Sequence, residues 1–128
     1  MRPRRVLAHG REITAIAEVP PIETLDARAA GAVFTLEELA YARSKSDPRR
    51  RLAARLAAKR AASRLLGGVV PPEAFEVAPA RGGPPRLVLS PSAETRLRAM
   101  GGSQMLLSLT HGRTHAAAAV VVLGASGA

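Results

Sequence analysis

The 128-residue sequence contains no cysteine and no tryptophan, and its aromatic side chains are only Phe34, Tyr41 and Phe75. Without thiols the chain can form neither disulfides nor thiolate metal sites. With so few aromatic rings, stacking on the bases of single-stranded nucleic acid has little support.

Long hydrophobic runs are also missing. No stretch approaches the roughly 20 apolar residues of a membrane span, and the basic segment 1–10 lacks the apolar run of a signal peptide. We therefore expect a cytoplasmic protein with no membrane association. The length suits a single domain over residues 1–128, with a frayed tail at 124–128.

Negatively charged residues are scarce. The chain has 10 Asp and Glu residues and 19 Lys and Arg residues, which gives a formal net charge of +9. The sequence pI is about 11.6. Such an excess favours an acidic partner, namely a nucleic acid, a nucleotide or an acidic protein. All the cations except Lys45 and Lys59 are arginines in a chain rich in Ala, Gly and Pro. Compositional bias would produce the same pattern, so charge alone does not choose among these partners.

The clearest element is a helix predicted from Asp47 to Gly67. Asp47 is a candidate N-cap, and Pro48 suits the first helical position, where its missing N–H is not needed. Gly67 provides the stop, since glycine adopts the left-handed conformation most easily. Between them lies an Ala, Leu and Arg run of high helix propensity.

This helix is apolar on two sides, which predicts a central position covered by other elements. One face carries Leu52, Leu56, Ser63 and Leu66, and the opposite face carries Ala54, Ala58, Ala61 and Leu65. Arg55 and Lys59 lie beside the leucines. Either their stems pack while their charges reach water, or they form a cationic phosphate site along a buried helix.

The rest of the chain alternates between helical and strand patterns. Thr35 and Glu38 form a capping box, Ser90 and Pro91 begin another helix, and residues 11–19 fit either a strand or a short helix. Further helices are predicted at 22–30, 36–43 and 91–100. Strands are predicted at 6–9, 75–77, 86–89, 105–109 and 116–123, with a turn at 110–114. This order indicates an α+β fold in which helices pack on a small antiparallel sheet.

Four strings in order along nearly the whole chain resemble the holo-acyl-carrier-protein synthase family, the small 4′-phosphopantetheinyl transferases. Residues 10–13 fall where the family has G-I-D-I, and residues 52–61 resemble its RFAAKEA helix. Residues 75–77 and 83–87 resemble its FEV…GKPRL hairpin, and residues 108–111 resemble its SLSH turn. No single string is specific, but their order and the length of the chain support the assignment.

The resemblance implies a β-ααα-ββ-α-ββ fold and a role in fatty acid or polyketide biosynthesis. Coenzyme A is then the substrate, and phosphopantetheine passes to a serine of an acidic acyl carrier protein as 3′,5′-ADP leaves. In the family, the Asp of G-I-D and the Glu of KEA hold a Mg²⁺ that neutralises the pyrophosphate. The resemblance also implies a homotrimer with sites between subunits.

Carried over position by position, the resemblance assigns specific roles. The candidate coenzyme A ligands are Arg55, Lys59, Arg60, Ser108, Thr110 and His111. The candidate catalytic residues are Glu12, Lys59 and His111, with Glu12 also the candidate metal ligand. We expect Arg55, Lys59 and His111 to converge on one phosphate-binding cleft.

Several positions depart from the family pattern. Glu12 replaces the metal-binding Asp, and Arg60 replaces the metal-binding Glu, although a guanidinium cannot ligate Mg²⁺. Glu18 falls where the family has a carrier-binding Arg, and Pro84 falls where it has a Lys. Two hypotheses follow. Arg60 takes over the role of the metal against the pyrophosphate, or the chain is an inactive homologue that binds coenzyme A or a partner protein. A basic nucleic-acid-binding domain ranks below both.

Overall fold

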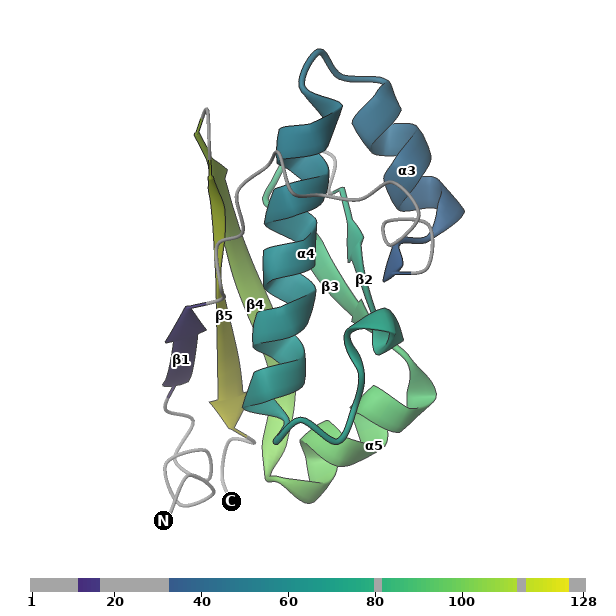
Figure 1. The fold of residues 1–128 in the computed structure, drawn as a ribbon. Helices are drawn as coiled ribbons and strands as arrows, with labels where there is room; N and C mark the ends of the chain where they lie inside the picture. Colours follow the sequence, from purple (N-terminus) through teal and green to yellow (C-terminus); the bar gives the residue numbers. More distant parts are fainter. Residues whose placement is uncertain (1–11, 17–32, 80–81, 113–114, 125–128) are drawn as a thin grey trace.

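The computed structural model describes residues 12–16, 33–79, 82–112 and 115–124 (Figure 1). The strand predicted at 6–9, the helix predicted at 22–30 and the residues 125–128 of the predicted tail lie outside these ranges. Gly124 itself is the last residue of a strand.

The described elements confirm the α+β prediction and the order of its parts. The helices are α3 (Leu36–Arg43), α4 (Pro48–Leu65) and α5 (Pro91–Ala99), with a 3₁₀ turn η2 (Pro72–Ala74). The strands are β1 (Glu12–Ile16), β2 (Phe75–Ala78), β3 (Arg86–Leu89), β4 (Gly102–His111) and β5 (Ala116–Gly124). The ambiguous segment 11–19 therefore contains a strand, β1. None of the described helices is long and apolar enough to cross a bilayer.

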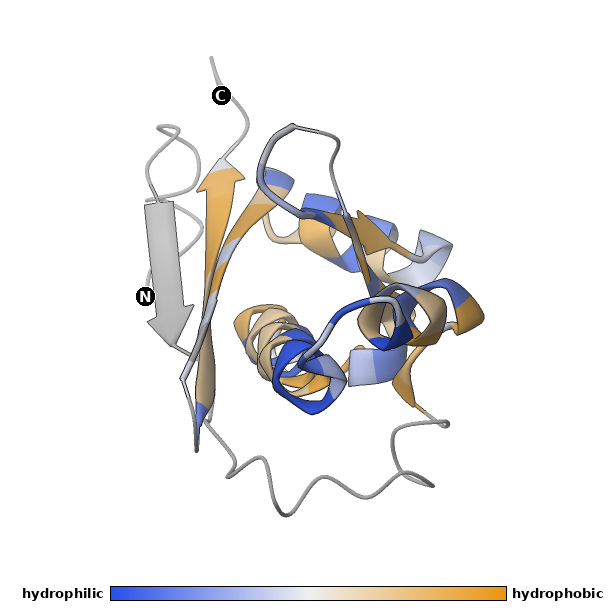
Figure 2. Ribbon diagram, turned by 90° about the horizontal axis from the view of Figure 1, so that it is seen from above, coloured by the Kyte–Doolittle hydropathy of each residue, from blue (hydrophilic) through white to orange (hydrophobic). Residues whose placement is uncertain are grey.

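The strands form two antiparallel sheets rather than one. The larger has the order β1-β5-β4 and the smaller pairs β2 with β3. Helix α4 lies between them, as the views from the side and from above both show (Figures 1 and 2). It packs on β5 and β4 on one side and on α3 and β2 on the other. The predicted central position of this helix is confirmed.

Small side chains allow α4 to approach the larger sheet closely. Strand β5 alternates between buried and half-buried residues along its length, as expected where one face of a sheet is covered. Its buried side chains meet the alanines of α4 in the main core. That contact comprises Ala57, Ala58, Ala61, Ala62, Ala118, Val120 and Val122.

The two ends of α4 differ in how well the sequence predicted them. Asp47 is the N-cap residue, as predicted, but its side chain makes no capping hydrogen bond. Its Oδ1 instead accepts from Arg51 Nε at 2.8 Å. At the other end Gly67 has φ +86°, and the N–H groups of Gly67 and Gly68 donate to the carbonyls of Arg64 and Ser63 at 3.0 and 2.9 Å. The predicted glycine stop is thus confirmed as a Schellman motif.

Strand β4 runs further than the sequence pattern indicates. Thr110 and His111 pair with Ala117 and Ala116 of β5, so they belong to the strand and the turn predicted to begin at residue 110 starts later. The N–H of Gly112 donates to the carbonyl of His115 at 2.7 Å.

Candidate functional site

A pocket of about 220 Å³ opens where α3, α4, the β2–β3 connection and β4 meet. Its polar side chains are Tyr41 from α3 and Arg51 and Arg55 from α4. The rest of its lining is Ala54, Pro79, Gly83, Pro85 and Leu109. The pocket therefore combines two guanidinium groups with apolar residues, an arrangement suited to an anion with an apolar part.

Arg55 is the least satisfied polar group of this pocket. Its side chain is almost buried, with 4% of the residue exposed, and its Nε has no hydrogen-bond partner among the described residues. Its Nη1 donates a long hydrogen bond of 3.4 Å to the carbonyl of Arg51. Burial lowers the pKa of Arg55, a shift that Tyr41 and Glu38 partly oppose. Since an unpaired buried donor costs about 1–3 kcal/mol, an anionic ligand would relieve a real penalty here.

Lys59 lies one turn further along α4 but does not line this pocket. It is fully buried, and its Nζ donates to Glu38 Oε1 at 2.6 Å and to the carbonyl of Val33 at 2.8 Å. The charge does not reach water, so the alternative of a packed stem with a solvated head is excluded for Lys59. Its assignment as a phosphate ligand stays a prediction, and it requires the pair with Glu38 to open.

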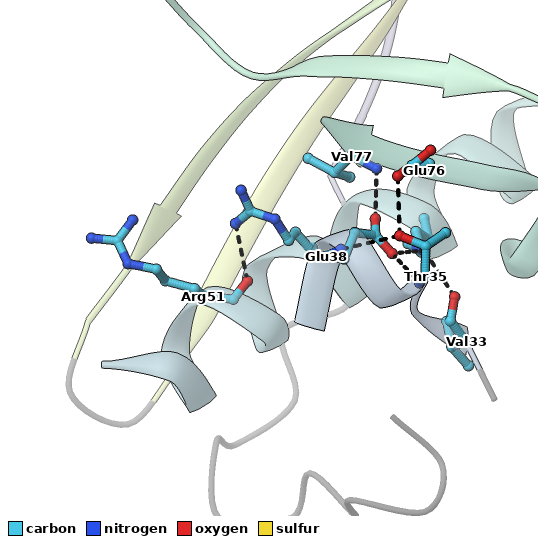
Figure 3. Close-up of polar contacts among 8 residues, drawn as sticks. Val33, Thr35, Glu38, Arg51, Glu76 and Val77 are labelled. Carbon is cyan, nitrogen blue, oxygen red and sulfur yellow. Dashed lines mark hydrogen bonds and ion pairs between the residues drawn. The ribbon is translucent and has the colours of Figure 1, made fainter. Parts of the chain in front are cut away.

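Glu38 joins three elements through one carboxylate. Besides Lys59 on α4, it accepts from the N–H of Thr35 at 2.8 Å and from the N–H of Val77 on β2 at 2.6 Å (Figure 3). Thr35 in turn donates to Glu76 at 3.0 Å. The sequence pattern identified Glu38 as half of a capping box, which the structure confirms. It could not show that the same carboxylate neutralises a lysine 21 residues away.

Two of the predicted ligands on β4, Ser108 and Thr110, lie on the other side of the sheet from Arg55. Met105 and Leu107 are buried beneath α4, whereas the alternating residues Ser108 and Thr110 are exposed. Within one chain, Ser108 and Thr110 therefore do not face the pocket. The side chains of Glu12 and His111 lie outside the described residues, although their backbones pair with Leu123 and Ala116 of β5.

Arg60 occupies the helix position where a metal-binding carboxylate was expected from the resemblance. It lies half-buried on α4, which also contacts β1, the strand of Glu12. A guanidinium offers only donors, and the described ranges hold no group of three or more His, Asp or Glu side chains placed for a metal. The residues described here do not fit a Mg²⁺ site of the expected kind.

Comparison with known proteins decides the family. A scan against protein-family models found no match. The chain is 35% identical over 115 residues to the holo-acyl-carrier-protein synthase of Koribacter versatilis, covering 84% of this chain and 92% of that protein. The chain belongs to the holo-acyl-carrier-protein synthase family. This confirms the resemblance carried by the four strings.

Solved structures of holo-acyl-carrier-protein synthases have the same fold. The acyl carrier protein synthase of Mycobacterium tuberculosis has a TM-score of 0.66 and 27% identity, with 88% of this chain and 96% of that one covered. The holo-acyl-carrier-protein synthase of Helicobacter pylori, solved in complex with coenzyme A, has a TM-score of 0.67 and 17% identity, with 86% and 99% covered.

Proposed function

We propose that this chain transfers 4′-phosphopantetheine from coenzyme A to a serine of an acidic acyl carrier protein. The observation that carries the proposal is Arg55, a nearly buried guanidinium with an unpartnered Nε at the wall of a pocket. A phosphate oxygen is the natural acceptor for such a group. Membership of the synthase family and the coenzyme A bound to the Helicobacter pylori neighbour support the choice of coenzyme A.

The reaction follows from phosphate chemistry. The serine oxygen of the carrier attacks the β-phosphorus of coenzyme A, the bond from that phosphorus to the bridging oxygen breaks, and 3′,5′-ADP leaves. Arg55 binds a phosphate, and Arg60 places positive charge against the pyrophosphate. Glu12 and His111 are the candidates to accept the serine proton. Lys59 holds α4 to α3 through Glu38 and joins the phosphate ligands only if that pair opens.

We also propose that the active site lies between subunits of a homotrimer. Ser108 and Thr110 lie on the exposed face of β4, away from Arg55, so one chain does not bring these candidates together. On the same face Leu106, 46% exposed, pairs with the half-buried Val121 of β5. A neighbouring subunit that covers this apolar face would bring Ser108, Thr110 and its own Arg55 pocket to a shared site.

The alternative is an inactive homologue that binds coenzyme A or a partner protein without transfer. Arg60 is the observation that favours it, because a cation replaces a carboxylate of the family's metal site. Nucleic-acid binding through the excess of arginines ranks lower, since the described helices and sheets present no groove-reading arrangement.

Mass spectrometry of a panel of apo carrier proteins, incubated with this protein, coenzyme A and Mg²⁺, tests these proposals. A mass gain of one phosphopantetheine on a carrier is the expected result. Calorimetric binding of coenzyme A without any mass gain would favour the inactive homologue. Tight binding of duplex DNA with no binding of coenzyme A would overturn both readings in favour of a nucleic-acid-binding domain.

A further inference from the structure

Tyr41 is surrounded by positive charge. In the described part of the chain, three cations lie over its ring: Arg55 at 4.6 Å, Lys45 at 5.1 Å and Arg51 at 5.9 Å from the centroid. The face of an aromatic ring is negative, so it attracts cations within about 6 Å. The ring of Tyr41 therefore attracts three positively charged side chains at the pocket wall that would otherwise repel one another.

The three cations differ in what else holds them. Lys45 is exposed to solvent. Arg51 pairs with Asp47 at 2.8 Å. Arg55 makes a long bond to the Arg51 carbonyl and a side-chain hydrogen bond with Tyr41, and its Nε has no partner among the described residues. Tyr41 is thus the side chain that holds the Arg55 guanidinium, through its ring and a hydrogen bond.

We propose that Tyr41 is a positioning residue, whose ring holds the Arg55 guanidinium in the pocket so that it is ready to bind a phosphate of the substrate. Stacking leaves the edge of a guanidinium, where its N–H donors lie, available to a ligand. It also removes rotamer freedom before binding, so less entropy is lost when the ligand enters. This inference deepens the proposed function and rests on it for the identity of the phosphate ligand.

The substitution Tyr41→Leu removes the ring and keeps apolar packing, whereas Tyr41→Phe keeps the ring and removes the hydroxyl. Calorimetry should show coenzyme A binding weakened about tenfold by Tyr41→Leu, the loss expected for a desolvated cation–π contact, and weakened less by Tyr41→Phe, which loses only the hydrogen bond with Arg55. Phe34→Leu is the matched control, because Phe34 lies 5.1 Å from Lys59 Nζ but does not line the pocket. It should leave the affinity unchanged in protein that remains folded.

A double-mutant cycle separates positioning from simple packing. If Tyr41 acts through Arg55, Tyr41→Leu should have no further effect on affinity in an Arg55→Ala background. The inference is overturned if Tyr41→Leu binds coenzyme A like the wild type, if Tyr41→Phe is as weak as Tyr41→Leu, or if the two losses simply add.

The same proteins distinguish failure of this inference from failure of the proposed function. A wild type that does not bind coenzyme A contradicts the proposed function, and the cycle is then run with inorganic pyrophosphate as the probe. Coupling between Tyr41 and Arg55 toward pyrophosphate would support the positioning role by itself. Absence of coupling, or of any pyrophosphate binding, would overturn it.

Discussion

Arg60 stands where the RFAAKEA motif that this helix resembles has a glutamate. We expect the charge at this one position to control how the transfer rate responds to Mg²⁺. Arg60→Glu should create a Mg²⁺ requirement for phosphopantetheine transfer, because two carboxylates with Glu12 suit the ion better than one. Arg60→Gln removes the repulsion without adding a ligand and should help less. The measurement is the transfer rate against Mg²⁺ concentration for all three proteins. Strong, saturable Mg²⁺ dependence of the wild type would contradict this prediction.

A second residue-scale prediction concerns the buried pair of Lys59 and Glu38. Lys59→Met should lower the free energy of unfolding by about 3–5 kcal/mol, because it leaves the Glu38 carboxylate buried without its cation. Adding Glu38→Gln should recover part of that loss, since the amide needs no counter-charge. Urea denaturation of the two single variants and the double variant measures the coupling. Strictly additive losses would show that the pair does not act as a unit.

At the scale of elements, the junction of α5, β4 and β5 depends on the absence of a side chain at Gly102. A Cβ there would overlap the Leu97 side chain of α5 and lie 3.1 Å from Val122 Cγ1 of β5. Gly102→Ala should therefore destabilise the fold by about 1–3 kcal/mol, the usual cost of overpacking a core.

Gly112→Ala is the matched control for this junction. The nearest atom to a Cβ at that position would be the His115 carbonyl oxygen, at an ordinary 3.6 Å. Thermal unfolding of both variants is the measurement. An unchanged midpoint for Gly102→Ala would mean that α5 shifts away from the sheet without cost.

At the scale of the whole molecule, the uncovered sheet face predicts an oligomer. Leu106→Asp places a charge beside Val121 and should convert a trimer into monomers with loss of transfer, because the proposed sites lie between subunits. Leu36→Asp is the control, since Leu36 is 81% exposed on α3. Light scattering coupled to size-exclusion chromatography gives the mass. A monomeric wild type with full transfer activity would contradict the trimer.

Features that depend on near neighbours in the chain could be predicted. The capping box of Thr35 and Glu38, the helix start at Pro91 and the glycine stop of α4 were all correct. At Asp47 the N-cap position was correct but the capping contact was not, because the carboxylate pairs with Arg51 four residues on rather than with the backbone. The end of β4 was wrong because strand pairing with β5, not the local pattern, extends it.

By itself the sequence determined the family, the order of the elements and the central helix with its two apolar faces. Motifs, caps and hydrophobic periodicity each depend on residues that lie close together in the chain. Only the tertiary structure decided how the charges are used. Lys59 pairs with a glutamate 21 residues away, Arg55 stacks on Tyr41 with a donor left unpaired, and Ser108 faces away from both. These outcomes depend on which helix and sheet faces meet, and that follows from packing between distant segments rather than from any local pattern.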